Sequence, residues 1–67
     1  MKITLNNRSI DVAEHATLHS LVVAHVGGVL TGVAVAVNHA VIARAQHEHY
    51  VLKPNDSVLI IQATQGG

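Results

Sequence analysis

The chain has 67 residues, with four basic and four acidic side chains, six histidines and no cysteine. A chain of this length forms one domain, and without cysteine it has no disulfide, no thiolate metal site and no cysteine nucleophile. Nucleic-acid binding is also disfavoured, because the charges form no basic face and Tyr50 is the single aromatic residue.

The first twelve residues predict a β-hairpin. Polar and apolar residues alternate over residues 2–6 and again over 9–12, with Asn6-Asn7 between the two runs. Asparagine tolerates the left-handed dihedrals of tight turns, so the turn falls at this pair. The apolar side chains of both strands then share one face of the hairpin, and they are Ile3, Leu5, Ile10 and Val12.

A helix of about three turns is expected over residues 17–26. Thr17 is its expected N-cap, and Gly27-Gly28 ends it. Apolar residues recur inside it at the spacing of one helix face, at Leu18, Leu21, Val22 and Val26. The glycine pair is not a phosphate loop, since it follows a helix instead of opening one.

The second half of the chain returns to the period of a β-strand. Valines at 33, 35 and 37 alternate with alanines at 34 and 36, and after the break at residues 38–40 a second short strand starts at Val41-Ile42. Residues 44–50 are polar and irregular, with room for a single helical turn. Residues 53–56 predict a β-turn, and residues 58–63 form a last strand that is apolar on both faces.

The resulting order, β-β-α-β-β-β, predicts an α+β fold of the β-grasp type, with a mixed sheet of about five strands and one helix packed on one face. A last strand that is apolar on both faces suits a central position beside the first strand. We expect residues 1–63 to form this single domain and residues 64–67 to form a flexible tail that ends in Gly66-Gly67.

Strand alternation also predicts a docking surface. If Val58 and Ile60 face the helix, then Leu59 and Ile61 point to the open face of the sheet, just before the tail. Two branched apolar side chains at this place are our candidates for contact with a partner protein. The alternative is that they are covered by neighbouring side chains or are singly exposed, which is common in soluble proteins.

These features together resemble the small sulfur-carrier proteins of thiamine biosynthesis, the ThiS family of ubiquitin-like β-grasp domains. The resemblance covers the whole chain and includes the hairpin, the capped helix, the Asn55-Asp56 turn and the terminal diglycine. Its most specific element is Val37-Asn38 followed by Val41 and Arg44. The sequence departs from the family pattern at Ala43, His47, Asn55 and Gln65, which puts in question which partners would accept it.

The resemblance implies a role as a protein cosubstrate rather than as an enzyme. The Gly67 carboxylate would be adenylated by a ubiquitin-activating-type adenylyltransferase and converted to a thiocarboxylate, while Gly66 and Gln65 thread into the partner's cleft. A sulfur donor protein and a thiazole synthase would be the other partners. The chain itself would bind no cofactor or metal, because ATP and magnesium would be used by the activating enzyme.

Two other functions are compatible with the same fold. One is the small subunit of molybdopterin synthase, which uses a similar C-terminal thiocarboxylate, although the short length and the segment from Asn38 to Arg44 argue against it. The other is a β-grasp interaction module without covalent chemistry, in which the tail is incidental.

The remaining polar residues carry no recognisable catalytic motif. The pair His15 and His19 could share a helix face, and His47 and His49 could point the same way on an extended segment, but no further ligand completes a metal site. We interpret the six histidines as solvated surface residues. For Arg44 we favour a structural role, with an ion pair to a surface carboxylate or to a partner as the options.

The N-terminal residues have neither the long apolar core of a signal peptide nor the length of a membrane span. From the sequence we therefore expect a cytoplasmic protein with no membrane partner.

Overall fold

The computed structural model describes residues 1–28 and 31–63, and it confirms the predicted order of elements. A 3-10 helix, η1, occupies the segment expected to be irregular with one helical turn. The elements in chain order are β1 (Lys2–Leu5), β2 (Arg8–Asp11), α1 (Leu18–Val26), β3 (Val33–Val37), β4 (Ala40–Val41), η1 (Arg44–His49) and β5 (Ser57–Gln62).

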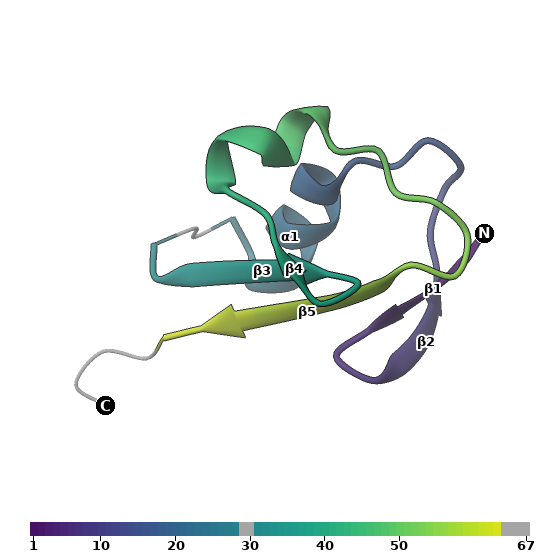
Figure 1. The fold of residues 1–67 in the computed structure, drawn as a ribbon, viewed down its shortest axis with the longest axis horizontal. Coiled ribbons are helices and arrows are strands. Elements are labelled where there is room, and N and C mark those ends of the chain that lie inside the picture. The colour runs from purple at the N-terminus through teal and green to yellow at the C-terminus, as the bar shows by residue number, and fades with distance from the viewer. Residues whose placement is uncertain (29–30, 64–67) are drawn as a thin grey trace.

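All five strands join one mixed sheet in the order β2-β1-β5-β3-β4. The first and last strands, β1 and β5, are parallel neighbours, and every other pair is antiparallel. Figure 1 shows β5 running through the middle of the sheet, with α1 and η1 on one side of it. This is the β-grasp fold, and β5 has the central position that its two apolar faces predict.

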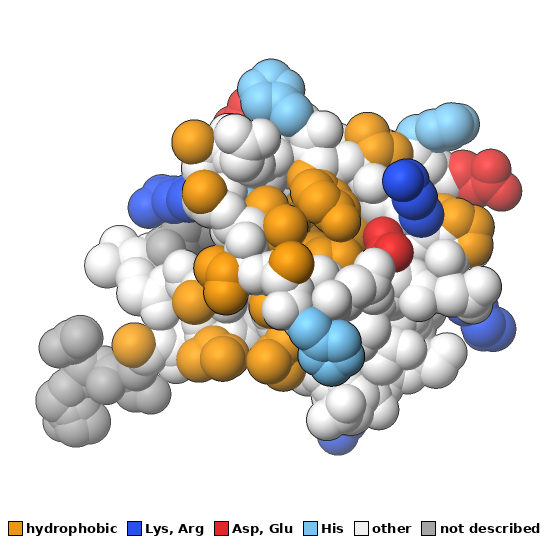
Figure 2. Space-filling view, in the orientation of Figure 1, with side chains coloured by type: hydrophobic (Ala, Val, Ile, Leu, Met, Phe, Trp, Pro, Cys, Tyr) orange, Lys and Arg blue, Asp and Glu red, His pale blue; other side chains and the backbone are white. Residues whose placement is uncertain are grey.

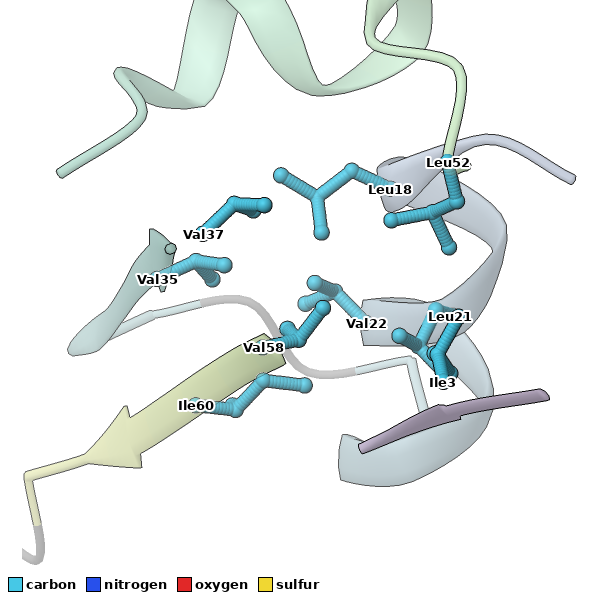
Figure 3. Close-up of a cluster of buried hydrophobic side chains, with 9 residues drawn as sticks. All are labelled: Ile3, Leu18, Leu21, Val22, Val35, Val37, Leu52, Val58 and Ile60. Atoms are coloured by element: carbon cyan, nitrogen blue, oxygen red, sulfur yellow. The ribbon is translucent and has the colours of Figure 1, made fainter. Parts of the chain in front are cut away.

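The core lies between α1 and the sheet. Side chains of β1, β3 and β5 point toward α1, and the nine buried apolar residues meet there (Figure 3): Ile3, Leu18, Leu21, Val22, Val35, Val37, Leu52, Val58 and Ile60. Leu52 is the member that the sequence periodicity does not reveal. Its backbone N–H donates to the carbonyl oxygen of Ala16, so the segment after η1 runs beside the start of α1 and closes the core.

The ends of α1 follow the sequence signals. The Thr17 hydroxyl accepts a hydrogen bond from the backbone N–H of Ser20 at 3.2 Å, as an N-cap residue should. Gly27 ends the helix in the left-handed conformation, with φ of 73°, and its N–H bonds back to Val23. The helix has nine residues, and within residues 1–28 and 31–63 no helix is long and apolar enough to cross a bilayer.

Several tight turns place non-glycine residues in the left-handed region. Asn6 and Asn7 join β1 to β2, Asn38 and His39 join β3 to β4, and Asn55 lies in the turn before β5, all with positive φ. Asparagine occupies this region at lower cost than most residues. Asn55, where φ is 70°, is therefore compatible with its turn.

Candidate functional site

The predicted site of covalent modification lies at the end of the chain that follows β5. Gly67, Gly66 and Gln65 are outside the described residues, so their roles stay predictions. The structure does describe the strand that leads to them, up to Ala63. The candidate site is therefore built from the contacts that hold β5 and from the surface that β5 presents.

The first of these contacts comes from Asn6, just after the end of β1. The backbone register between β1 and β5 ends at Leu5 and Val58, and the N–H of Asn6 donates to the carbonyl oxygen of Val58 at 2.9 Å. The side chain of Asn6 then continues the pairing. Its Nδ2 donates to the carbonyl oxygen of Ile60 at 3.2 Å, and its Oδ1 accepts from the N–H of Ile60 at 2.8 Å. The side-chain amide thus imitates a peptide group and holds β5 one step further along its length.

We expect Asn6→Gly to lower the free energy of unfolding by about 1 to 2 kcal/mol, because two hydrogen bonds to Ile60 are lost. Asn7→Gly is the matched control. Asn7 is exposed and also has positive φ, so glycine relieves backbone strain there and should stabilise by up to about 1 kcal/mol. Urea unfolding of both variants measures the difference. Equal free energies of unfolding for the two variants would show that the hydrogen bonds of the Asn6 side chain do not stabilise the fold.

A second set of contacts fixes the start of β5. The Asp56 carboxylate is buried, and it accepts hydrogen bonds from Asn38 Nδ2 at 3.0 Å and from the backbone N–H of Lys53 at 2.8 Å. Asn38 Oδ1 accepts in turn from the N–H of Ser57 at 2.9 Å. The bond to Lys53 closes the turn that the sequence predicts over residues 53–56. The bond to Asn38 gives that asparagine, part of the most family-specific element, a structural purpose: it ties the β3–β4 turn to β5.

The open face of the sheet carries an uncharged apolar surface over β5, β3 and β4. Leu59 is 44% exposed and Ile61 57% exposed, as strand alternation predicts. Residues paired across neighbouring strands share a face, so the register adds Ala36 beside Leu59, Ala34 beside Ile61, and Val41 on the far side of Ala36. We call this set the open-face patch: Ala34, Ala36, Val41, Leu59 and Ile61. Figure 2 shows hydrophobic side chains gathered in this region.

Polar side chains lie at one border of the open-face patch. A depression of about 210 Å³ borders it, lined by Asn7, Ala36, His39, Ser57, Val58 and Leu59. The ion pair found among the described residues, Lys2 with Asp11 at 3.2 Å, lies across the sheet on β1 and β2. The docking role of Leu59 and Ile61 stays a prediction, but both residues are exposed where such a role needs them.

The interpretation of all six histidines as solvated is wrong for His47. Its side chain is buried, and Nε2 lies 3.0 Å from the carbonyl oxygen of Ile42. His47 and His49 also do not point the same way, because they belong to η1, where residues two apart are separated by about 240°. His15 precedes the N-cap of α1, so it does not share a helix face with His19.

The histidines form no metal site that the structure shows. Within residues 1–28 and 31–63, no group of three or more potential ligands from His, Cys, Asp and Glu comes together. His47 instead belongs to the interior next to α1, where it lines a small cavity with Val22, Val33 and Arg44.

Arg44 makes no ion pair within the described part of the chain, so the expected option of a carboxylate on the chain's own surface is not observed there. Its backbone begins η1, and its side chain lies beside buried His47 at the cavity.

Comparison with known proteins agrees with this architecture. The profile of the ThiS family matches residues 2–67. Among solved structures, the fold is similar to the crystal structure of a thiamine biosynthesis protein (ThiS) from Geobacter metallireducens, with 26% identity, a TM-score of 0.82 and coverage of 100% of both chains. Comparison with curated protein sequences gives no significant match. Because the family profile spans nearly the whole sequence, the chain belongs to the ThiS family.

Proposed function

We propose that this protein is a sulfur carrier for thiazole formation in thiamine biosynthesis, and that the carboxylate of Gly67 carries the sulfur. The observation that supports this most strongly is the ThiS family match, which extends over residues 2–67 and so includes the diglycine. The similar structure from Geobacter metallireducens is itself a thiamine biosynthesis protein.

The chemistry of the proposal begins with a carboxylate, which is a poor electrophile. A partner adenylyltransferase joins the Gly67 carboxylate to AMP from ATP and releases pyrophosphate, so that AMP becomes a good leaving group. A persulfide on a sulfur donor protein then attacks the carbonyl carbon and displaces AMP. A thiol then attacks the donor's sulfur atom in this acyl disulfide, which releases a thiocarboxylate on Gly67 and leaves a disulfide between the thiol and the donor cysteine.

In this scheme the chain acts as a cosubstrate and not as an enzyme. It has no cysteine, and Ser20, one of its serines, uses its hydroxyl to bond the carbonyl oxygen of Thr17 at 2.8 Å. ATP, magnesium and the groups that transfer sulfur belong to the partners. The same proposal places the protein in the cytoplasm, where ATP-dependent partners and a thiazole synthase would meet it.

The domain contributes a rigid base and a docking surface. Residues 64–67 span at most about 13 to 14 Å when fully extended, so the body must dock close to the partner's active site. Fixing each tail residue costs about 1 to 2 kcal/mol of backbone entropy. Prior docking through the open-face patch would offset this cost, and glycine at 66 and 67 keeps the approach free of side chains.

The proposal is tested by intact-mass analysis of the chain after incubation with ATP, magnesium, a cognate activating enzyme and a sulfur donor. We expect a transient mass increase of one AMP and then replacement of one oxygen by sulfur, both located at Gly67 by fragmentation. An unchanged mass would leave a non-covalent β-grasp module as the better description. Thiamine auxotrophy after gene deletion, rather than loss of molybdopterin, would support the thiazole pathway.

A further inference from the structure

The end of β5 is held from one side only. On the β1 side, the last contact is the one between Asn6 and Ile60. On the β3 side, pairing continues to Val33 and Gln62, and the N–H of Ala63 then donates to the carbonyl oxygen of Gly32 at 2.8 Å. Among the described residues, Gly32 therefore supplies the last backbone contact before residues 64–67.

Two observations show that this position is built for glycine. The φ of Gly32 is 74°, a conformation that side chains disfavour. A Cβ atom added there would lie 3.3 Å from the carbonyl oxygen of Ala63 and 3.6 Å from its Cβ. The nearest of these atoms belongs to the backbone, so an alanine Cβ at Gly32 requires the Ala63 carbonyl at the end of β5 to shift by a few tenths of an ångström.

We propose that Gly32 is a positioning residue for the modification of Gly67, because it fixes the point from which the tail reaches into the partner. This inference rests on the proposed function. Covalent transfer depends on placing the reacting carboxylate within a narrow range, and a displacement of about 1 Å can cost up to about 100-fold in rate. Loss of the contact between Gly32 and Ala63 moves the last described backbone contact of β5 back to the pair Val33 and Gln62, which widens the range of positions from which the tail starts.

The test compares Gly32→Ala with Gly27→Ala. The two glycines have nearly the same φ, 74° and 73°, so alanine strains the backbone equally at both. At Gly27, however, an added Cβ meets nothing within 4 Å. The pair therefore separates the effect of moving Ala63 from the effect of a strained turn.

We expect Gly32→Ala to lower the kcat of adenylation and sulfur transfer about tenfold with KM within about twofold, and Gly27→Ala to leave kcat within about twofold of the unaltered chain. The chain is the substrate, so partial unfolding reduces the concentration of folded carrier and raises the apparent KM. A misplaced tail instead lowers kcat at saturating carrier. Amide exchange at Ala63, followed by NMR, should be faster in Gly32→Ala alone.

Ala63→Pro tests the same hydrogen bond without altering the loop before β3, and it serves if Gly32→Ala does not fold. Proline removes the donor N–H, while Gln62 before it is already extended. We expect a similar fall in kcat. Equal kcat for Gly32→Ala and Gly27→Ala, or an unchanged kcat for Ala63→Pro, would overturn this inference alone. A chain that is never modified would overturn the proposed function and this inference with it.

Discussion

Deletion of Gly67 is expected to reduce adenylation and sulfur transfer at least about 100-fold while changing the free energy of unfolding by less than about 0.5 kcal/mol. The buried apolar residues lie between Ile3 and Ile60, so the deletion removes none of them. The variant still ends in a glycine carboxylate, that of Gly66, but its penultimate residue is now Gln65 and not a glycine. A side chain then occupies a position where the proposed approach needs bare backbone.

Deletion of Thr64 is the matched control for this experiment. It shortens the tail by the same length, about 3.3 to 3.6 Å, yet keeps Gly66-Gly67 at the end. We expect this variant to lose much less activity than the Gly67 deletion, as judged by the rate of AMP-adduct formation in intact-mass spectra. Equal losses would assign the effect to reach and not to the diglycine, and a loss of folding in the Gly67 deletion would make the tail part of the fold.

The features that the sequence predicted correctly are those determined by neighbouring residues. Alternation in residues 2–12 and 33–37 predicts which side chains face the helix, and Thr17 and Gly27 mark the ends of α1. The central place of β5 was predicted from the apolar side chains on both of its faces, because such a pattern is typical of a strand with neighbours on both sides. These signals are local, so one sequence contains them in full.

The residues that sequence reasoning missed depend on contacts between distant segments. Leu52 ends the short apolar run Tyr50-Val51-Leu52 between two polar segments, and it is buried because residues 50–52 run back along the start of α1. His47 is buried for a related reason: η1 packs against α1 and turns this side chain inward, where Ile42 supplies a partner for its ring. Periodicity over a window of one element carries no information about either contact.

The residues of the candidate site also fall into those that local sequence predicts and those that depend on distant contacts. Leu59 and Ile61 were predicted on the open face from alternation alone, whereas Val41, Ala34 and Ala36 join them only through the strand register. The sequence places Asn6 in a turn, but its bonds to Ile60 span 54 positions of the chain. Gly32 gave a weak signal, a glycine at the start of an alternating run. The positioning role that we propose for Gly32 depends on its contact with Ala63, which is 31 positions away in the sequence.

Leu59→Glu is expected to raise the KM for the activating enzyme about 30-fold, which corresponds to about 2 kcal/mol of binding free energy, with kcat within about twofold. Leu59 pairs with Ala36 within the open-face patch, and both residues line the depression beside it. An apolar interface formed there would have to bury the new carboxylate without a partner, which is costly. Isothermal titration calorimetry or steady-state kinetics at several carrier concentrations measures the change.

Val51→Glu is the matched control, because Val51 is 46% exposed against 44% for Leu59 but lies outside the sheet, opposite Thr17. Both substitutions place one carboxylate at a half-exposed aliphatic position, so the general effect of net charge is shared. If docking uses the open face, only Leu59→Glu weakens binding. Equal KM values for the two variants would mean that the partner approaches the tail from another side of the domain, and that the exposed side chains of β5 are not its docking surface.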